Sequence, residues 1–444
     1  MDRDFAFNAM KLALAQGADE AEVYTRISKN LAVEVKNHKV ETLESSLTSG
    51  YGIRVIKNKQ PGFSYSTDPG KISRVVDAAL SVAHYAEPDE NIGFPLPLQA
   101  GKMRIFDGRI AAITGDKAID LVMLIEKGAL DTDRRITKIR KSLGSFGTDN
   151  TCIVNSQGID ACYTSTICSA QLTVVAEYGA DSQLGWDYEM SRLLDENAFA
   201  KVGAGAARRA LQLLCARKIN PVKGFIILDN SVAAEFLAIL TASLSSDAVQ
   251  KGKSMLAGKK GERVISTFLN IMDNGLLDDL PGSSPFDGEG VPAQNKVLIE
   301  EGVLKGFLYN TYTARKEGVQ STGNAARSGF AGIPGVGPTN IYIGPASPEH
   351  TQELGKLIEA VNRGLYVTET MGMHTANPVT GEFSVGISGL WIEDGTVSYP
   401  VKEAVISGTV LDLFRQVVMI GSDLRFYGNI GSSSLMIESI DISG

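Results

Sequence analysis

The first half of the chain alternates between helical and strand-like patterns of hydrophobic residues. Over residues 4–16, apolar side chains recur every three or four positions, which predicts an amphipathic helix that ends at Gly17. Residues 21–28 and 31–37 alternate apolar and polar side chains, as the two strands of a hairpin do. Further expected elements are a hairpin over 50–66, helices over 72–86, 117–129 and 196–216, and strands over 135–145, 151–155 and 159–178. This order predicts a mostly antiparallel sheet with helices.

The pattern changes near Asn220 and Pro221, where short apolar runs begin to alternate with Gly, Pro, Asn and Asp. Many short strands with turns between them favour a β sandwich or a barrel. We therefore expect an α+β protein with two domains. Residues 1–219 would form an N-terminal α/β domain with an antiparallel sheet and helices. Residues 220–444 would form a mainly β, sandwich- or barrel-like domain, in which the apolar helix over 232–244 packs in the core.

Composition narrows the possible functions. The chain of 444 residues has a net charge of −8, which argues against direct nucleic-acid binding because such proteins usually carry a basic face. Its first residues do not resemble a signal peptide, and its apolar runs are too short to span a membrane. We therefore expect a cytoplasmic protein without a membrane partner. The four cysteines, Cys152, Cys162, Cys168 and Cys215, lack a Cys-x-x-Cys spacing and are expected to be buried, reduced thiols.

Catalytic motifs are scarce. The chain has four histidines, and none belongs to a His-Glu-x-x-His arrangement that would bind zinc. A Gly-x-Ser-x-Gly elbow and a Walker A sequence are also missing. His374 lies in a glycine-containing loop, and Arg327 follows a glycine turn from which it could clamp a carboxylate. The alternative for Arg327 is a plain turn with a surface arginine. The residues alone thus indicate no recognisable catalytic constellation.

Several blocks in the second half nevertheless resemble the TldD/PmbA family in order and spacing. They are Lys251–Ser254, Gly261–Val264, Phe286–Pro292, Leu298–Leu304, Ser321–Ala325, Asn377–Ser384 and Tyr399–Val401. No single block is specific, but the ordered set is. The resemblance implies a paired assembly of two related subunits around an enclosed chamber that cleaves short or unfolded peptides.

The resemblance also implies which subunit this chain is. TldD-type members carry His-Glu-x-x-x-His upstream of the first block and a cysteine near the C-terminus. The corresponding positions here are Leu237, Ala238 and Ala242, and the last cysteine is Cys215. The chain is therefore similar to the PmbA (TldE) type, which implies a non-catalytic subunit without a metal. Zinc or iron is expected in a TldD-like partner, and a homodimer is expected when that partner is absent.

Two other functions stay open. The chain could be a free-standing hydrolase that uses His374 with Glu382, or a non-enzymatic regulator that binds a topoisomerase, since family descriptions mention DNA gyrase. Loops that combine Gly or Pro turns with polar side chains often carry function on a rigid β scaffold. The expected peptide-binding residues on such loops are Tyr309, Asn324, Arg327, His374 and Asn377. The alternative is that Asn324 and Asn377 only hold tight turns.

Overall fold

A long antiparallel sheet forms the first half of the chain. The computed structural model describes residues 3–444 and places six strands in the order β3-β2-β1-β4-β5-β6. Neighbouring strands run antiparallel throughout this sheet. The strands are β1 (Glu20–Lys36), β2 (Lys39–Lys57), β3 (Gln60–Ser66), β4 (Ile136–Asn155), β5 (Asp160–Tyr178) and β6 (Asp181–Ser191). The predicted antiparallel sheet is confirmed.

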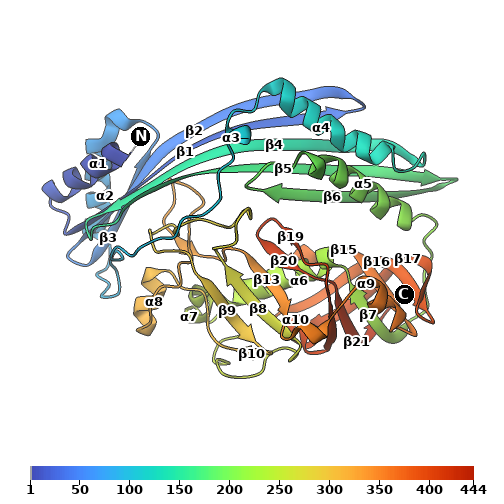
Figure 1. The fold of residues 1–444 in the computed structure, drawn as a ribbon. Helices are drawn as coiled ribbons and strands as arrows, with labels where there is room; N and C mark the ends of the chain where they lie inside the picture. Colours follow the sequence, from blue (N-terminus) through green and yellow to red (C-terminus); the bar gives the residue numbers. More distant parts are fainter. Residues whose placement is uncertain (1–2) are drawn as a thin grey trace.

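Helices cover one face of this sheet, and the other face lies towards the C-terminal domain (Figure 1). The helices are α1 (Arg3–Ala15), α2 (Ile72–Tyr85), α3 (Gly108–Ala111), α4 (Gly115–Leu130) and α5 (Glu196–Gln212). Helices α4 and α5 share an apolar core with Val33, Phe146 and Leu172 of the sheet. Helices α1 and α2 share another core with Tyr51 and Ile53. Because side chains alternate along a strand, the intervening residues face the C-terminal domain.

Two strands are longer than the sequence pattern predicts. The predicted breaks fall at residues 29–30 of β1 and 146–150 of β4, and these two segments pair with each other. Polar side chains interrupt the hydrophobic alternation at these residues. The main-chain pairing between β1 and β4 nevertheless continues through them, so each strand is continuous. The pattern also misses β6 and residues 39–49 of β2, which contain few apolar side chains.

Two mixed sheets make up the C-terminal domain, which confirms the predicted mainly β character. Their strand orders are β10-β9-β8-β13-β20-β19 and β14-β18-β21-β7-β15-β16-β17, and β11-β12 form a small third sheet. The first eight strands are β7 (Val222–Leu228), β8 (Leu269–Asn274), β9 (Asn295–Glu300), β10 (Val303–Leu304), β11 (Ala325–Ala326), β12 (Gly335–Val336), β13 (Ile341–Pro345) and β14 (Thr351–Gln352). The others are β15 (Arg363–Met371), β16 (Glu382–Glu393), β17 (Thr396–Thr409), β18 (Val417–Gly421), β19 (Arg425–Tyr427), β20 (Ile430–Ser432) and β21 (Leu435–Ile442). The predicted boundary at residues 219 and 220 lies just before β7.

Helix α6 contributes to the core that the two C-terminal sheets share. The helices of this domain are α6 (Asn230–Ser243), α7 (Ser246–Gln250), α8 (Thr311–Glu317), α9 (Leu354–Glu359) and α10 (Val410–Arg415). Leu237 and Leu240 of α6 are fully buried, but Ala238 and Ala242 are exposed. The expectation that α6 packs in the core is therefore correct for the face with Leu237 and Leu240 but wrong for the face with Ala238 and Ala242.

The cysteines differ from the sequence expectation. Cys152 and Cys162 form a disulfide, so they are not free thiols. They lie directly opposite each other in the β4–β5 hairpin, with Cα atoms 4.1 Å apart, because the turn between the strands sets that register. Cys168 is a buried thiol as predicted, whereas Cys215 is exposed.

Candidate functional site

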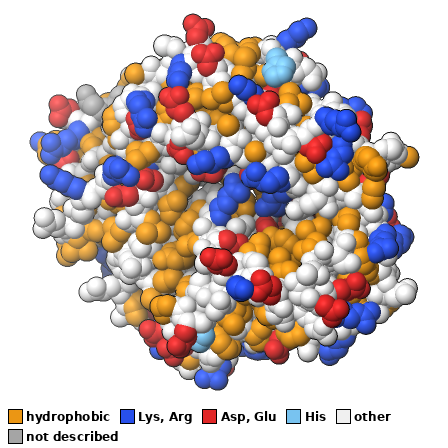
Figure 2. Space-filling model, turned by 45° about the vertical axis from the view of Figure 1, so that its right-hand side comes forward, with side chains coloured by type: hydrophobic (Ala, Val, Ile, Leu, Met, Phe, Trp, Pro, Cys, Tyr) orange, Lys and Arg blue, Asp and Glu red, His pale blue; other side chains and the backbone are white. Residues whose placement is uncertain are grey.

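Opposite α4 and α5, the face of the first sheet that lies towards the C-terminal domain is polar, whereas nearer α1 and α2 the same face packs on Phe286 through Tyr24 and Ile153. Asn30, Ser145, Asp149, Gln171 and Thr173 alternate with the residues under α4 and α5 and are half-buried. The Ser145 hydroxyl and the Asn30 amide oxygen are hydrogen-bonded at 2.7 Å. One side of the molecule is hollowed near its centre, where basic and acidic side chains lie together (Figure 2). The polar part of this face has no apolar layer, which suits the wall of a solvent-filled space better than a domain core.

A cluster of charged and aromatic side chains joins α5 and β6 to the C-terminal domain. Arg209 on α5 lies 2.9 Å from the Asp229 carboxylate and 3.6 Å from that of Glu369. The Trp186 indole N–H donates a hydrogen bond to Glu369 at 2.9 Å, and the Arg209 guanidinium lies 5.1 Å from the Trp186 ring centroid. The Tyr366 hydroxyl donates to Asp229 at 2.6 Å. These contacts fix the sheet relative to the C-terminal domain at this end.

The carboxyl groups near this cluster differ in their pKa values. Burial raises the pKa of Glu369 and, on α6, that of Glu235. Burial would also raise the pKa of Asp229, but Arg209, Ser231 and Tyr366 together hold it below its ordinary value. Acids whose pKa values are raised are found at functional sites, although structural networks produce the same shift. Because Glu369 is bound to Trp186 and Arg209, the structural explanation is sufficient for it.

A second charged network joins β1 and β2 to loops of the C-terminal domain. Arg54 Nε lies 2.8 Å from Glu22 Oε1, and Arg54 Nη2 lies 3.2 Å from Glu289 Oε1. Arg327 also forms an ion pair with Glu22, and its Nε donates to the Gly288 carbonyl at 2.6 Å. The expectation of an exposed Arg327 is wrong, since its side chain is only 2% exposed. Its guanidinium is therefore already bound inside the protein.

Tyr309 and Asn324 are also buried, with exposures of 6% and 2%. The Tyr309 hydroxyl donates to the Glu317 carboxylate at 2.7 Å. Asn324 Nδ2 donates to Asp273 Oδ2 at 2.8 Å. The structure does bring Asn324 and Arg327 to one small cavity of about 160 Å³. Their side chains, however, are hydrogen-bonded to neighbouring loops and strands, so these residues shape the cavity wall.

His374 and Asn377 lie on a separate, exposed loop between β15 and β16. Asn377 Oδ1 accepts the N–H of Val379 at 2.9 Å, which fits the turn-holding alternative. Glu382 accepts a hydrogen bond from Thr380 at 3.1 Å. Within residues 3–444, no hydrogen bond or ion pair joins His374 to Glu382. The sequence-predicted residues thus fall into a buried group and an exposed group rather than one site.

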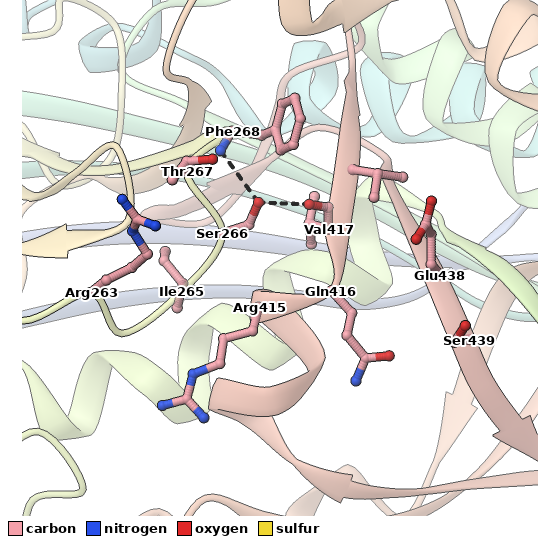
Figure 3. Close-up of a pocket in the computed structure, with 11 residues that line it drawn as sticks. Arg263, Ile265, Ser266, Thr267, Phe268, Arg415, Gln416, Val417, Glu438 and Ser439 are labelled. Atoms are coloured by element: carbon pink, nitrogen blue, oxygen red, sulfur yellow. Dashed lines mark hydrogen bonds between the residues drawn. The ribbon is translucent and has the colours of Figure 1, made fainter.

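Two surface pockets lined by residues of the described range 3–444 were candidates for a site that the sequence did not indicate. A pocket of about 580 Å³ has Arg263, Arg415 and Glu438 in its lining. Figure 3 shows that the two arginines point in different directions and that Glu438 lies on the other side. A second pocket of about 370 Å³ lies between the domains and has mainly apolar walls, which include Phe63 and Phe94. Neither pocket brings a nucleophile, a base and an acid together.

The α6 positions that correspond to a metal motif cannot hold a metal. Leu237 is fully buried in the core, and Ala238 and Ala242 have no donor atom. Across residues 3–444, no three His, Cys, Asp or Glu side chains are grouped so that they could hold a metal ion. The side chains present therefore do not fit the zinc or iron chemistry of a metallopeptidase.

Comparison with known families accounts for almost the whole chain. The three domains of the PmbA/TldA metallopeptidase family match residues 21–83 (domain 1), 108–214 (central domain) and 223–444 (C-terminal domain). The chain belongs to the PmbA/TldD metallopeptidase family. This finding confirms the resemblance that the ordered sequence blocks indicate. Within residues 3–444, no helix is long and apolar enough to cross a membrane.

Individual members of the family extend this result. The metalloprotease PmbA of Escherichia coli O157:H7 is 31% identical over 443 residues, which cover 98% of this chain and 94% of the relative. A TldD homologue of Haemophilus influenzae is 24% identical, and the match covers 98% of this chain and 92% of the homologue. A Thermotoga maritima structure, named as a candidate modulator of a DNA gyrase, superposes with a TM-score of 0.90 at 26% identity and 99% coverage of both chains.

The fold also matches TldE from Thermococcus kodakarensis, with a TM-score of 0.89 at 22% identity. That match covers 99% of this chain and 100% of the archaeal one. Both structural matches cover the N-terminal sheet and the C-terminal sheets, so these structures share the complete fold of this chain.

Sequence reasoning missed the residues that join the two domains of this PmbA/TldD chain. Trp186, Arg209 and Glu369 come from β6, α5 and β15, which are far apart in the sequence. No local spacing connects them. The available signal was indirect: Trp186 is one of only two tryptophans, and Arg209 interrupts an otherwise alanine-rich helix.

Proposed function

We propose that this chain is the non-catalytic subunit of a two-subunit PmbA/TldD metallopeptidase that degrades or processes short or unfolded peptides. The α6 helix carries the proposal, because the motif positions that the resemblance implies hold Leu237 and Ala242 in place of the two histidine ligands and Ala238 in place of the glutamate base. A TldD-like partner would supply the zinc or iron and the reacting groups. This chain would supply part of the chamber wall and the surface that holds the partner.

The polar face of the first sheet supports a role as chamber wall. An extended peptide can pair with main-chain groups, and such pairing tolerates many side-chain sequences. Half-buried polar residues such as Asn30, Gln171 and Thr173 would keep that surface wetted and free of an apolar layer. Among the residues expected at loops, His374 and Asn377 are exposed and stay available for contacts with peptide or partner. Tyr309, Asn324 and Arg327 would act through the shape of the wall.

The deciding experiment is reconstitution with a TldD-like subunit. We expect no peptide cleavage by this chain alone, and we expect the mixture to cleave an unfolded peptide faster than the partner alone. A partner whose metal-motif glutamate is changed to glutamine is the matched control, and it should abolish cleavage by the mixture. Metal analysis of this chain, purified without chelating resin, should find less than one zinc or iron per chain.

Each alternative function has a distinct result in the same experiment. Cleavage by the purified chain alone, lost on His374→Ala, would establish the free-standing hydrolase. If the mixture is no more active than the partner alone, but the chain binds a purified topoisomerase, the regulator is favoured. The exposed positions of His374 and Glu382, without a contact between them, already weigh against a preformed hydrolase site.

A further inference from the structure

A surface pocket of about 430 Å³ lies where the chain passes from the first sheet to the C-terminal domain. Residues 217–220 form one wall of this pocket, and strands β15, β16 and β17 form the rest. In Figure 1, the chain runs from α5 down to the C-terminal domain beside β17. The Arg217 N–H donates to the Pro400 carbonyl and the Lys402 N–H donates to the Arg217 carbonyl, each at 3.1 Å. The wall formed by the linker is therefore fixed to the sheet.

Two arginines line this pocket without an acceptor for their N–H groups. Within residues 3–444, the side chains of Arg217 and Arg363 make no hydrogen bond and no ion pair. By contrast, Arg209 and Arg425 are bound to carboxylates. A guanidinium group carries five N–H donors. The donors of Arg217 and Arg363 are therefore available to a ligand.

Aromatic rings hold both guanidinium groups in place. The Arg217 guanidinium lies 3.5 Å from the ring centroid of Tyr399, and the Arg363 guanidinium lies 5.7 Å from that of Trp391. A stacked guanidinium keeps its N–H donors in its own plane, where they match the geometry of phosphate and carboxylate oxygens. Arg263 also lacks an acceptor, but it lies over no aromatic ring of residues 3–444. The stacking therefore sets Arg217 and Arg363 apart from an ordinary surface arginine.

The charge of the pocket favours an anion. Three of the four charged residues in its lining are basic, namely Arg217, Lys218 and Arg363, and the fourth is Glu393. Lys218 is bound to Glu403 at 2.6 Å, so the two arginines are the unpaired cations of the lining. The whole chain has a net charge of −8. Attraction of an anion to this pocket is therefore a local property and not one of the whole surface.

The middle of the pocket contains groups that suit hydroxyls. Glu393 accepts hydrogen bonds from the Trp391 indole N–H at 3.0 Å and from the Ser398 hydroxyl at 3.2 Å. A carboxylate has about four acceptor sites, so Glu393 can accept further hydrogen bonds. The linker lies next to β17, and the sheet continues with β16 and β15. Glu393 and Ser398, on β16 and β17, therefore lie between the two arginines.

We propose that this pocket binds a small sugar phosphate with anionic groups at both ends, one on each arginine, and with its hydroxyl groups on Glu393 and Ser398. A guanidinium binds phosphate through two parallel hydrogen bonds, and a carboxylate is a common acceptor for sugar hydroxyls. The two guanidinium groups lie over different rings, whose centroids are 6.3 Å apart, so they suit two separate anionic groups better than one. The pocket volume is in the range of small-molecule sites. This proposal does not rest on the peptidase function, since it needs no partner subunit and no peptide.

Isothermal titration calorimetry with fructose 1,6-bisphosphate tests the site. We expect a Kd below about 100 µM, and an affinity at least about tenfold higher than that of glucose 6-phosphate, which has one phosphate. Arg217→Gln and Arg363→Gln should each lower the affinity for the bisphosphate about tenfold or more. Arg263→Gln is the matched control and should leave that affinity unchanged, because Arg263 lines a different pocket. A Kd above about 1 mM, or an affinity that survives both pocket variants, would overturn the proposal.

A second ligand tests the role of the hydroxyl groups. Hexane-1,6-diol bisphosphate carries two terminal phosphates but no further hydroxyl, so it should bind about fivefold more weakly or worse. Equal affinity would overturn the assignment to a sugar. Thermal unfolding provides the control for folding. Both arginine variants should melt within about 2 °C of the parent chain, because substitutions of exposed side chains have small effects on stability. The bisphosphate should raise the melting temperature of the parent chain and of Arg263→Gln, but not that of either pocket variant.

Discussion

Replacing Arg327 with methionine should destabilise the protein strongly, which is the opposite of what an exposed arginine would do. The Arg327 side chain is 2% exposed and Glu22 is 1% exposed. Methionine keeps much of the side-chain volume but removes the charge and all five N–H donors. Glu22 would keep Arg54, which lies 2.8 Å away, but it would lose one of its two guanidinium partners. The carbonyls of Gly288 and Gly332 would lose their donors as well.

The magnitude follows from these contacts. Removing one partner of a buried ion pair typically costs about 3–5 kcal/mol, because the other charge stays buried and less well compensated. The remaining contact with Arg54 favours the lower part of this range. Losing charged donors to two carbonyls adds roughly 1–3 kcal/mol. We expect a total loss of about 4 kcal/mol in the free energy of unfolding. For a cooperative unit near two hundred residues, this corresponds to a melting temperature lower by roughly 8–16 °C.

Differential scanning fluorimetry and urea unfolding measure this effect. Arg415→Met is the matched control, since Arg415 is 47% exposed and pairs with Asp412 on the surface, where such pairs contribute under about 1 kcal/mol. A double-mutant cycle with Glu22→Gln isolates the coupling, which should exceed about 1 kcal/mol. If Arg327→Met fails to fold, Arg327→Lys provides a milder variant with the charge retained. A melting temperature equal to that of Arg415→Met, or zero coupling, would refute the assignment of Arg327 to the interior.

Two further predictions concern the domain cluster and the hairpin. In a Trp391→Phe background, Trp186 fluorescence should titrate with a midpoint above the ordinary glutamate pKa of 4.5, because burial raises the pKa of its partner Glu369. Between pH 4.5 and the raised pKa of Glu369, the folded protein then binds more protons than the unfolded chain. The free energy of unfolding should therefore fall as the pH rises through that window. Glu369→Gln should abolish the fluorescence titration and make the fall in unfolding free energy smaller, since Glu235, whose pKa burial also raises, still contributes to that fall. Mass spectrometry of the non-reduced protein should find a peptide pair linked through Cys152 and Cys162, and a free thiol at either position would contradict this pairing.

The elements with a clear hydrophobic period are predictable from the sequence, but long-range polar contacts are not. Helices α1, α2 and α4 lie within two residues of their predicted bounds, because their apolar stripes pack on the sheet. Asn324 and Arg327 look like surface residues in a glycine turn, because a buried polar side chain with satisfied hydrogen bonds has the same local sequence as an exposed one. Their partners Asp273 and Glu22 lie in distant strands.

The disulfide could have been found from the sequence. Cys152 and Cys162 lie five residues to either side of Gln157 in the turn over residues 155–158. A hairpin with that turn places them opposite each other, since its register is set by the turn. The absence of a Cys-x-x-Cys motif therefore excluded only one kind of cysteine pair.

The position of α6 explains how a subunit can lose metal ligands and keep its architecture. The helix is held by its opposite face, where Phe236 packs on Phe383 with ring centroids 4.9 Å apart and Leu240 is fully buried. Its N-terminal cap Asp229 is fixed by Arg209 and Tyr366. None of these contacts involves the face that carries Ala238 and Ala242. Alanine at positions 238 and 242 leaves every one of these contacts intact, and Leu237, at the first position of the motif, adds to the buried core. A subunit of the proposed non-catalytic type can thus keep the architecture of the family while the exposed face of its α6 carries no reacting group.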